Sequence, residues 1–152
     1  MTTPVGPCVM DASVGIKLFL PEAGSEAAQE LINRHAAEPE ACAIWVPDLF
    51  HVECANILWK AVGRGRLSTV AARNCLEDLG ALRLNSVPTR ELVGDALGLA
   101  LKHGTSVYDA TYAALAVRLG LPLVTADQRL REQLSGSPVK LHSLPMPAVS
   151  PP

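Results

Sequence analysis

Short hydrophobic runs alternate with longer amphipathic stretches along most of this chain. Each run spans only a few residues and is bounded by polar residues, glycine or proline, which is typical of buried strands. The run at 82–87 is the least regular because Asn85 interrupts it. The predicted strands cover residues 7–10, 43–46, 82–87, 121–124 and 139–144, the last as an edge strand.

The stretches between these runs have the spacing of amphipathic helices. Ala28, Leu31 and Ile32 fall on one helical face, for example, and Asp48 after Pro47 is most simply a helix N-cap. The predicted helices cover residues 14–20, 24–37, 48–62, 68–79, 88–103, 106–119 and 128–134. This alternation predicts an α/β fold, with a parallel sheet covered by helices on both faces.

Residues 106–127 contain the clearest pairing of a helix with a strand. Ser106 can cap the helix start and Gly120 can end the helix. Asp109 lies outside the apolar stripes of this helix, on a strip of small side chains. A short apolar strand follows at 121–124, and the tripeptide Thr125-Ala126-Asp127 lies at its C-terminal end. The segment therefore places one carboxylate near each end.

Length and composition narrow the class of protein. The chain has 152 residues, 49% of them hydrophobic, which suits one domain with a sizeable core. We expect this domain to span residues 1–144, followed by a Pro-rich tail at 145–152. The net charge of −2 disfavours broad, nonspecific binding to nucleic acid. The four cysteines and four histidines show no metal-ligand spacing.

Nothing in the sequence directs the chain to a membrane. No apolar run approaches the roughly 18 residues of a membrane-spanning helix. The N-terminus lacks a basic region and meets an acid at Asp11, which argues against a signal peptide. The scattered cysteines suit a reducing compartment. We expect a cytoplasmic protein.

Acidic residues follow three of the predicted strands. Asp11 ends the first strand, Asp127 ends the fourth, and Glu53 lies in the second turn of the helix that follows the second strand. The C-terminal ends of parallel strands meet at one edge of the sheet, where open α/β folds place their chemistry. Counting strand directions does not fix the position of Asp109, but its helix must run down to the start of the fourth strand. That requirement favours the same edge.

Each of these acids also has a simpler local explanation. Asp11 can cap the short helix that follows it. Glu53 taken alone is most simply a solvated carboxylate on a helix surface. Only the joint placement of the acids points to a site.

Four carboxylates at one edge repel one another unless a cation lies between them. The sequence offers no obvious internal Lys or Arg partner, and a site built only from oxygen ligands suits Mg²⁺ or Mn²⁺. Such an ion can activate water and polarise a phosphoryl oxygen. The leading reaction class is therefore phosphodiester hydrolysis.

The same residues resemble the PIN-domain endoribonucleases and, within them, the VapC-like toxins of bacterial type II toxin–antitoxin pairs. The resemblance covers nearly the whole chain and implies a three-layer α/β/α sandwich around a central, mostly parallel sheet. Its motifs are VMDAS at 9–13, PDLFHVECAN at 47–56, YDATYAALA at 108–116 and LVTAD at 123–127.

The resemblance also implies roles for the acids. The four family acids correspond to Asp11, Glu53, Asp109 and Asp127. Asp11 and Asp109 are expected to ligate Mg²⁺ or Mn²⁺ directly, and Asp127 to bind the same ion or a second one. Glu53 would contact the metal or orient its water.

Three further polar residues are candidates for a supporting shell around the acids. Ser13 and Thr125 stand where the family often has Ser or Thr, and would hydrogen-bond carboxylates or water. Asn56, one helical turn after Glu53, would steady that carboxylate. Local capping of a turn or helix explains these residues equally well. One departure from the family is Ala126, where Asn often precedes the last acid.

The family implies partners as well. Its toxins act on RNA, usually form homodimers and are silenced by a cognate antitoxin protein. Among the basic residues that could form an RNA-binding rim, Arg129 is the only one to which we assign that role.

The sequence also allows other classes of protein to be considered. A phosphatase of the haloacid dehalogenase type would need Asp where this chain has Ser13, and a receiver domain would need Asp after the third strand, at Val87-Pro88. The more serious alternative is a PIN-like protein-binding module without significant catalysis. The presence of all four acids counts against that alternative.

Overall fold

The computed structural model describes residues 6–144. Within them, five strands form one sheet: β1 (Cys8–Met10), β2 (Ile44–Pro47), β3 (Asn85–Val87), β4 (Leu123–Thr125) and β5 (Leu141–Ser143). All neighbouring strands pair in parallel, in the order β3-β2-β1-β4-β5. This confirms the predicted α/β class. The predicted Pro-rich tail at 145–152 lies outside the described residues.

The sheet changes its direction of growth between β1 and β4. The chain adds β2 and β3 on one side of β1, then returns to place β4 and β5 on the other. Ligands of open α/β sheets bind beyond the strand ends at such a switch point. Asp11 follows β1 directly, and Asp127 comes two residues after the end of β4.

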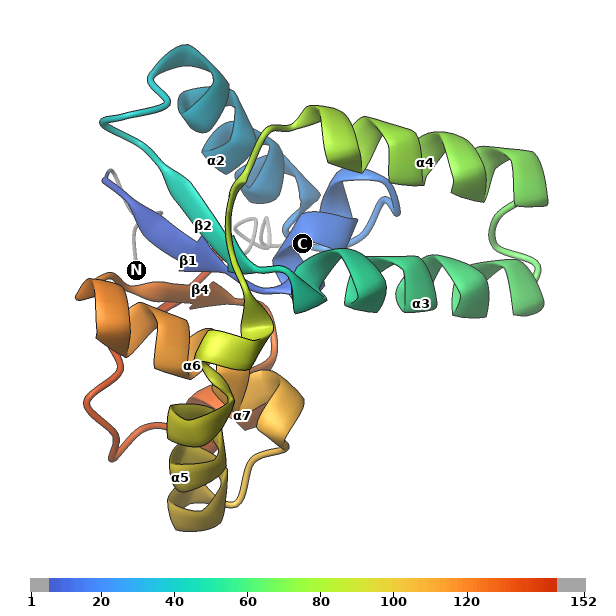
Figure 1. Cartoon of the computed structure of the whole chain (residues 1–152). Helices are drawn as coiled ribbons and strands as arrows, with labels where there is room; N and C mark the ends of the chain where they lie inside the picture. Colours follow the sequence, from blue (N-terminus) through green and yellow to red (C-terminus); the bar gives the residue numbers. More distant parts are fainter. Residues whose placement is uncertain (1–5, 145–152) are drawn as a thin grey trace, which may run out of the picture.

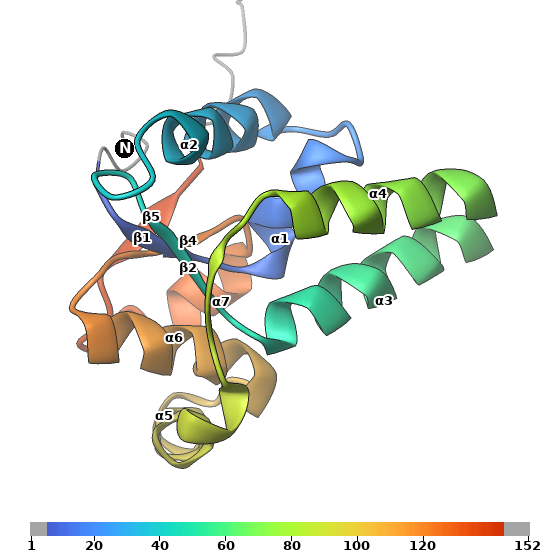
Figure 2. The same cartoon turned by 45° about the horizontal axis from the view of Figure 1, so that its top comes forward.

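Helices cover the sheet on both faces. Within the described residues, the helices are α1 (Ala12–Gly15), α2 (Ser25–Ala37), α3 (Leu49–Gly63), α4 (Thr69–Ala81), α5 (Val93–His103), α6 (Val107–Leu119) and α7 (Gln128–Gln133), with short 3-10 turns at Ile16–Leu18 and Thr89–Glu91. Figures 1 and 2 show α2 on one face and α6 on the other, with α5 outside α6. In both views, α3 and α4 form a hairpin that projects from the sheet. None of these helices is long and apolar enough to cross a membrane.

Several predicted boundaries were wrong, each for a local reason. The helix expected at 14–20 begins at Ala12 and tightens into a 3-10 turn after Gly15. The strand expected at 82–87 forms only at Asn85–Val87, since Leu82 caps the end of α4 and Arg83 has a positive φ of 52°. The helix expected at 88–103 divides into a 3-10 turn and α5.

Asp48 occupies the predicted N-cap position of α3, but its side chain does not cap the helix. Asp48 Oδ1 instead accepts a hydrogen bond from Thr89 N at 2.8 Å, while Thr89 Oγ1 accepts one from Leu49 N at 3.0 Å. These two hydrogen bonds hold the start of α3 against the segment that follows β3.

The core beneath the strand ends is tightly packed around Gly15. Phe50 and Met10 are fully buried, and α1 packs against α3. A Cβ atom added at Gly15 would lie 2.6 Å from Phe50 Cζ and 2.9 Å from Phe50 Cε2. A contact that close requires the ring to move, so glycine is needed here for the approach of α1 to α3.

We predict that Gly15→Ala destabilises the protein by about 1–3 kcal/mol, because the added methyl group overpacks the core against Phe50. Gly80→Ala is the matched control, since a Cβ at Gly80 meets nothing within 4 Å. It should be neutral or stabilising by up to about 1 kcal/mol. Urea unfolding of the three proteins checks this, and a Gly15→Ala variant as stable as Gly80→Ala would refute it.

Candidate active site

Asp11 is the most buried acid at the strand ends. Its residue is 5% exposed, and Oδ1 accepts hydrogen bonds from Ser13 Oγ at 2.5 Å and from Val14 N at 3.3 Å. The second of these caps α1, as the simpler interpretation expected. The structure therefore uses one oxygen of Asp11 to begin a helix and places the carboxylate at the switch point of the sheet.

Ser13 and Thr125 connect the ends of β1 and β4. Ser13 Oγ accepts a hydrogen bond from Ala126 N at 3.0 Å and lies 3.5 Å from Thr125 Oγ1. Thr125 is fully buried, and its hydroxyl oxygen accepts a hydrogen bond from Asp127 N at 3.1 Å. Both hydroxyls also favour the charged form of Asp11 and so lower its pKa. They hold the Asp11 carboxylate and the backbone before Asp127 in one network.

Asp127 lies at the start of α7 and is exposed. Its Oδ1 accepts a hydrogen bond from Leu130 N at 3.1 Å, so it caps α7 as Asp11 caps α1. The two strand-end acids share this arrangement because each strand turns directly into a helix.

Glu53 is half-buried in the second turn of α3, beside the buried side chain of Tyr112 on α6. Glu53 Oε1 and the Tyr112 hydroxyl are both buried, and neither makes a hydrogen bond of good geometry within residues 6–144. The two groups nevertheless interact: the hydroxyl lowers the pKa of Glu53, and the carboxylate raises the pKa of Tyr112. Two unsatisfied polar groups thus face each other at the site.

Asp109 is the acid that links the other three. It lies half-buried in the first turn of α6, where Ser106 Oγ accepts a hydrogen bond from Asp109 N at 3.1 Å. The Asp109 carboxylate raises the pKa of Asp11 and of Glu53, and Asp127 raises the pKa of Asp109. The structure therefore brings the four predicted acids within electrostatic reach of one another.

Burial favours the neutral form of three of these acids, Asp11, Glu53 and Asp109. It is the largest cause that raises the pKa of Glu53 and of Asp109 above the usual range. For Asp11, burial raises the pKa to about 6, against the opposing hydrogen bonds of Ser13, Thr125 and Val14. Arg129 is exposed on α7, and its charge lowers the pKa of Asp109.

The chemistry of these side chains fits a hard divalent cation. Within residues 6–144, no three His, Cys, Asp or Glu side chains close around a point where they could hold an ion. Mg²⁺ does not require three, since it is usually held by one or two carboxylates and keeps several waters. Glu53 Oε1 is a buried oxygen without a partner, and a cation or its water would satisfy it.

Two of the residues around the acids differ from expectation. Asn56 is exposed and makes no hydrogen bond to Glu53 among the described residues, so its predicted role requires another side-chain conformation. Tyr112 occupies the place beside Glu53 instead. Its position three residues after Asp109 puts both side chains on neighbouring parts of α6.

The family model of the PIN domain matches residues 8–133. The chain belongs to the PIN-domain family. It is 41% identical over 129 residues to ribonuclease VapC3 of Pyrobaculum aerophilum, across 82% of this chain and 92% of the relative. This confirms the resemblance found in the sequence and places the chain with the VapC ribonucleases.

Solved structures of the family share the fold. PAE2754 of Pyrobaculum aerophilum matches with a TM-score of 0.65 and 24% identity, over 92% of this chain and 84% of that one. A chain of VapBC2 from Rickettsia felis, solved bound to a DNA fragment from their promoter, matches with a TM-score of 0.63 and 13% identity, over 90% and 98%. These likenesses confirm the PIN-like sandwich.

We predict that Asp11→Asn stabilises the metal-free protein at high pH. Because the pKa of Asp11 is raised from 3.8 to about 6 on folding, the folded state binds the extra proton between these values. As the pH rises from below 3.8 to above 6, ionisation of Asp11 therefore lowers the free energy of unfolding by about 3 kcal/mol. Asn carries no charge and removes this loss.

Thermal unfolding in EDTA at pH 4 and pH 8 measures the effect. We expect Asp11→Asn to gain stability over the wild type at pH 8 but little at pH 4, and Asp78→Asn, at an exposed acid of α4, to gain none at either pH. An equal effect of Asp11→Asn at both pH values would contradict the prediction.

Proposed function

We propose that this chain is a metal-dependent endoribonuclease, the toxin of a type II toxin–antitoxin pair, which hydrolyses RNA phosphodiester bonds at its four-carboxylate site. The observation on which this rests is the electrostatic linkage of Asp11, Glu53 and Asp127 through Asp109 at the switch point of the sheet. A VapC ribonuclease at 41% identity supports the choice of reaction. A PIN-like binding module that has lost catalysis would have no need to keep buried acids that destabilise it.

The roles of the acids follow from their surroundings. Asp11 and Asp109 would ligate Mg²⁺ or Mn²⁺ directly, since Asp11 is the most buried and Asp109 interacts with all of the others. Asp127 would bind the same ion or a second one, and Glu53 would contact the ion or its water. Dependence on a divalent metal is a general property of these nucleases. The bound ion supplies Lewis acidity toward the phosphoryl oxygen and the attacking water.

The surrounding residues would hold these carboxylates in place. Ser13 fixes the orientation of Asp11 through its 2.5 Å hydrogen bond, and Thr125 orders the backbone before Asp127. After a small rotation of its side chain, Tyr112 would donate a hydrogen bond from its hydroxyl group to the Glu53 carboxylate. Arg129, which is exposed and lowers the pKa of Asp109, would contact an RNA phosphate.

The proposed partners follow from the function. RNA is the substrate, and a cognate antitoxin protein would silence the toxin. The likeness to a VapBC2 chain supports an antitoxin partner. We further propose a homodimer in the cytoplasm, where RNA and the antitoxin would meet it.

Cleavage of RNA by the purified, antitoxin-free protein tests the proposal. We expect cutting with Mg²⁺ or Mn²⁺, none in EDTA, and a loss of more than about 100-fold in Asp109→Asn, beyond the usual effect of losing an outer-shell partner. Asp78→Asn is the matched control, because it makes the same change at an exposed acid. A circular RNA substrate distinguishes internal cleavage from trimming of ends.

Equal cutting by wild type and Asp109→Asn would indicate a contaminating nuclease. Failure of the folded wild type to cut transfer, ribosomal and messenger RNA with either metal would favour the binding module.

We predict that Tyr112→Phe lowers the cleavage rate about tenfold without destabilising the fold. The hydroxyl is buried and unsatisfied, so its removal leaves the melting temperature unchanged or raised. Because Tyr112 lowers the pKa of Glu53, its loss should also move the acid limb of the pH–rate profile to higher pH. Tyr108→Phe, at an exposed tyrosine, should alter neither. A Tyr112→Phe enzyme with wild-type rate and profile would refute the positioning role.

A further inference from the structure

A cavity of about 220 Å³ adjoins the acids, between the end of β5 and the 3-10 turn that follows α1. Its lining includes Lys17 from that turn and Arg131 from α7. Ala126 also lines it, and Ala126 N donates a hydrogen bond to Ser13 Oγ, which in turn donates one to Asp11. The cavity therefore lies beside the acid site without being part of it.

Arg131 brings an unsatisfied donor to this cavity. Its Nε is buried and has no hydrogen-bond partner within residues 6–144, and its side chain makes no ion pair there. Buried donors are nearly always paired in folded proteins, so an acceptor is expected beside this one. A guanidinium donates from Nε and Nη in a planar fork that matches the oxygens of a phosphate.

Lys17 supplies a second cation, which the local structure holds in place. Its side chain is only 12% exposed, and Lys17 Nζ donates a hydrogen bond to Glu22 Oε1 at 3.0 Å. The stem of Lys17 passes Gly24, where φ is +90° and an added Cβ would lie 3.5 Å from Lys17 Cδ. Together with Glu22, the two cations leave one positive charge in excess, which one phosphodiester balances.

The two arginines of α7 serve different sides of this helix. Arg129 and Arg131 are two residues apart, which separates them by about 200° around the helix axis. The charge of Arg129 acts on Asp109, whereas Arg131 lines the cavity. An RNA strand that crosses α7 can therefore reach the acids with one phosphate and the cavity with a neighbouring one.

We propose that the cavity lined by Lys17 and Arg131 binds a phosphodiester of the RNA substrate close to the one that is cut. The proposal rests on the proposed function, which supplies the RNA, and adds a positioning site outside the acids. Arg131 Nε donates a hydrogen bond to a phosphate oxygen, and Lys17, shared with Glu22, neutralises the phosphate charge. Binding there sets which linkage of the strand lies at the acids.

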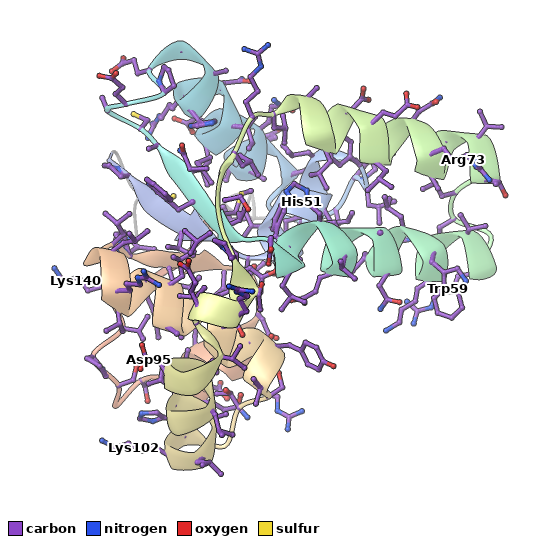
Figure 3. All side chains as sticks on the ribbon, in the orientation of Figure 1. His51, Trp59, Arg73, Asp95, Lys102 and Lys140 are labelled. Carbon is purple, nitrogen blue, oxygen red and sulfur yellow. The ribbon has the colours of Figure 1, made fainter. Side chains whose placement is uncertain are left out.

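The groove between α3 and α4 does not fit an anion in this way. It has a volume of about 290 Å³, and Arg73 is the one charged residue among those that line it. The other lining side chains are mostly apolar, including Leu58, Trp59 and Leu76. Figure 3 shows Arg73 towards the far end of the α3–α4 hairpin, away from the sheet. Arg73 is therefore a suitable reference for an arginine outside the proposed site.

Proton–nitrogen correlation NMR of the isotope-labelled full chain in EDTA tests the site directly. Arg131→Gln assigns the Nε–H signal of Arg131, since the variant lacks it. We expect this signal to shift when inorganic phosphate is added and when a single-stranded RNA of mixed sequence is added. The Nε–H signal of Arg73 should not shift with phosphate. The measurement needs neither metal nor cleavage, so a failure of the proposed nuclease activity would not affect it.

Fluorescence anisotropy with the same RNA in EDTA measures what the site contributes to affinity. Arg131→Gln and Lys17→Gln should each raise the dissociation constant about tenfold. Because both side chains bind one phosphate, the double variant should reduce the slope of log Kd against log salt by about 0.7, the value for one phosphate of a single strand. Lys140→Gln is the control, at an exposed lysine before β5 and thus at the opposite edge of the sheet, and should change neither quantity (Figure 3).

Glu22→Gln separates anion binding from loss of the ion pair. It breaks the same ion pair as Lys17→Gln but keeps the cation, so it should tighten RNA binding severalfold. An Arg131 signal that does not respond to RNA, wild-type affinity in Arg131→Gln, or a Glu22→Gln variant that weakens binding as Lys17→Gln does would overturn the proposal. A slope reduced by about 1.4 in the double variant would also overturn it, because two phosphates would then be bound.

Discussion

The burial of Asp11, Glu53 and Asp109 close to one another at the switch point of the sheet is the constraint on which the site depends. Burial dominates at Asp11, Glu53 and Asp109, and Asp109 adds its charge to the others. The positive charge of Arg129 opposes this effect at Asp109, but Arg129 is exposed. Burying such carboxylates lowers the stability of the folded chain at neutral pH, which is the cost expected of a site kept for the proposed function. In the proposed function, a hard cation would relieve this repulsion and would accept RNA phosphates as further ligands.

Two short strands and the helices that follow them are enough to bring these acids together. Strands β1 and β4 are short and lie side by side, and each turns directly into a helix capped by the acid that ends the strand. Ser13 then ties the two strand ends together through Ala126 N and the Asp11 carboxylate. The helices α3 and α6 bring Glu53 and Asp109 to the same place, and the packing of Gly15 against Phe50 sets how closely α1 approaches α3. Capping and chemistry are therefore served by the same side chains.

The sequence could predict features that depend on residues close together in the chain, but not features that depend on contacts between distant residues. Asp11 and Asp127 were predictable because the position of an acid after a buried strand depends on the strand alone. Asp109 was harder to place, since two helices separate its strand from the preceding one. The proposed role of Tyr112 was not predicted because an aromatic residue at helical spacing is usually core, and only the tertiary structure brings its hydroxyl to Glu53. Asp48 was assigned to the wrong partner because Thr89 lies 41 residues away in the chain.

Titration of Mg²⁺ or Mn²⁺ into the metal-free protein by calorimetry tests the central claim most directly. Measured in buffers of different ionisation enthalpy, it reports both the affinity and the protons released. If the carboxylates hold the metal, binding at pH 5.5 should release protons, because Asp11 with a pKa of about 6 must ionise, and release should vanish by pH 8. Binding should be lost in Asp109→Asn and kept in Asp78→Asn. No binding by the wild type, or equal binding by Asp109→Asn, would contradict a metal centre at these acids.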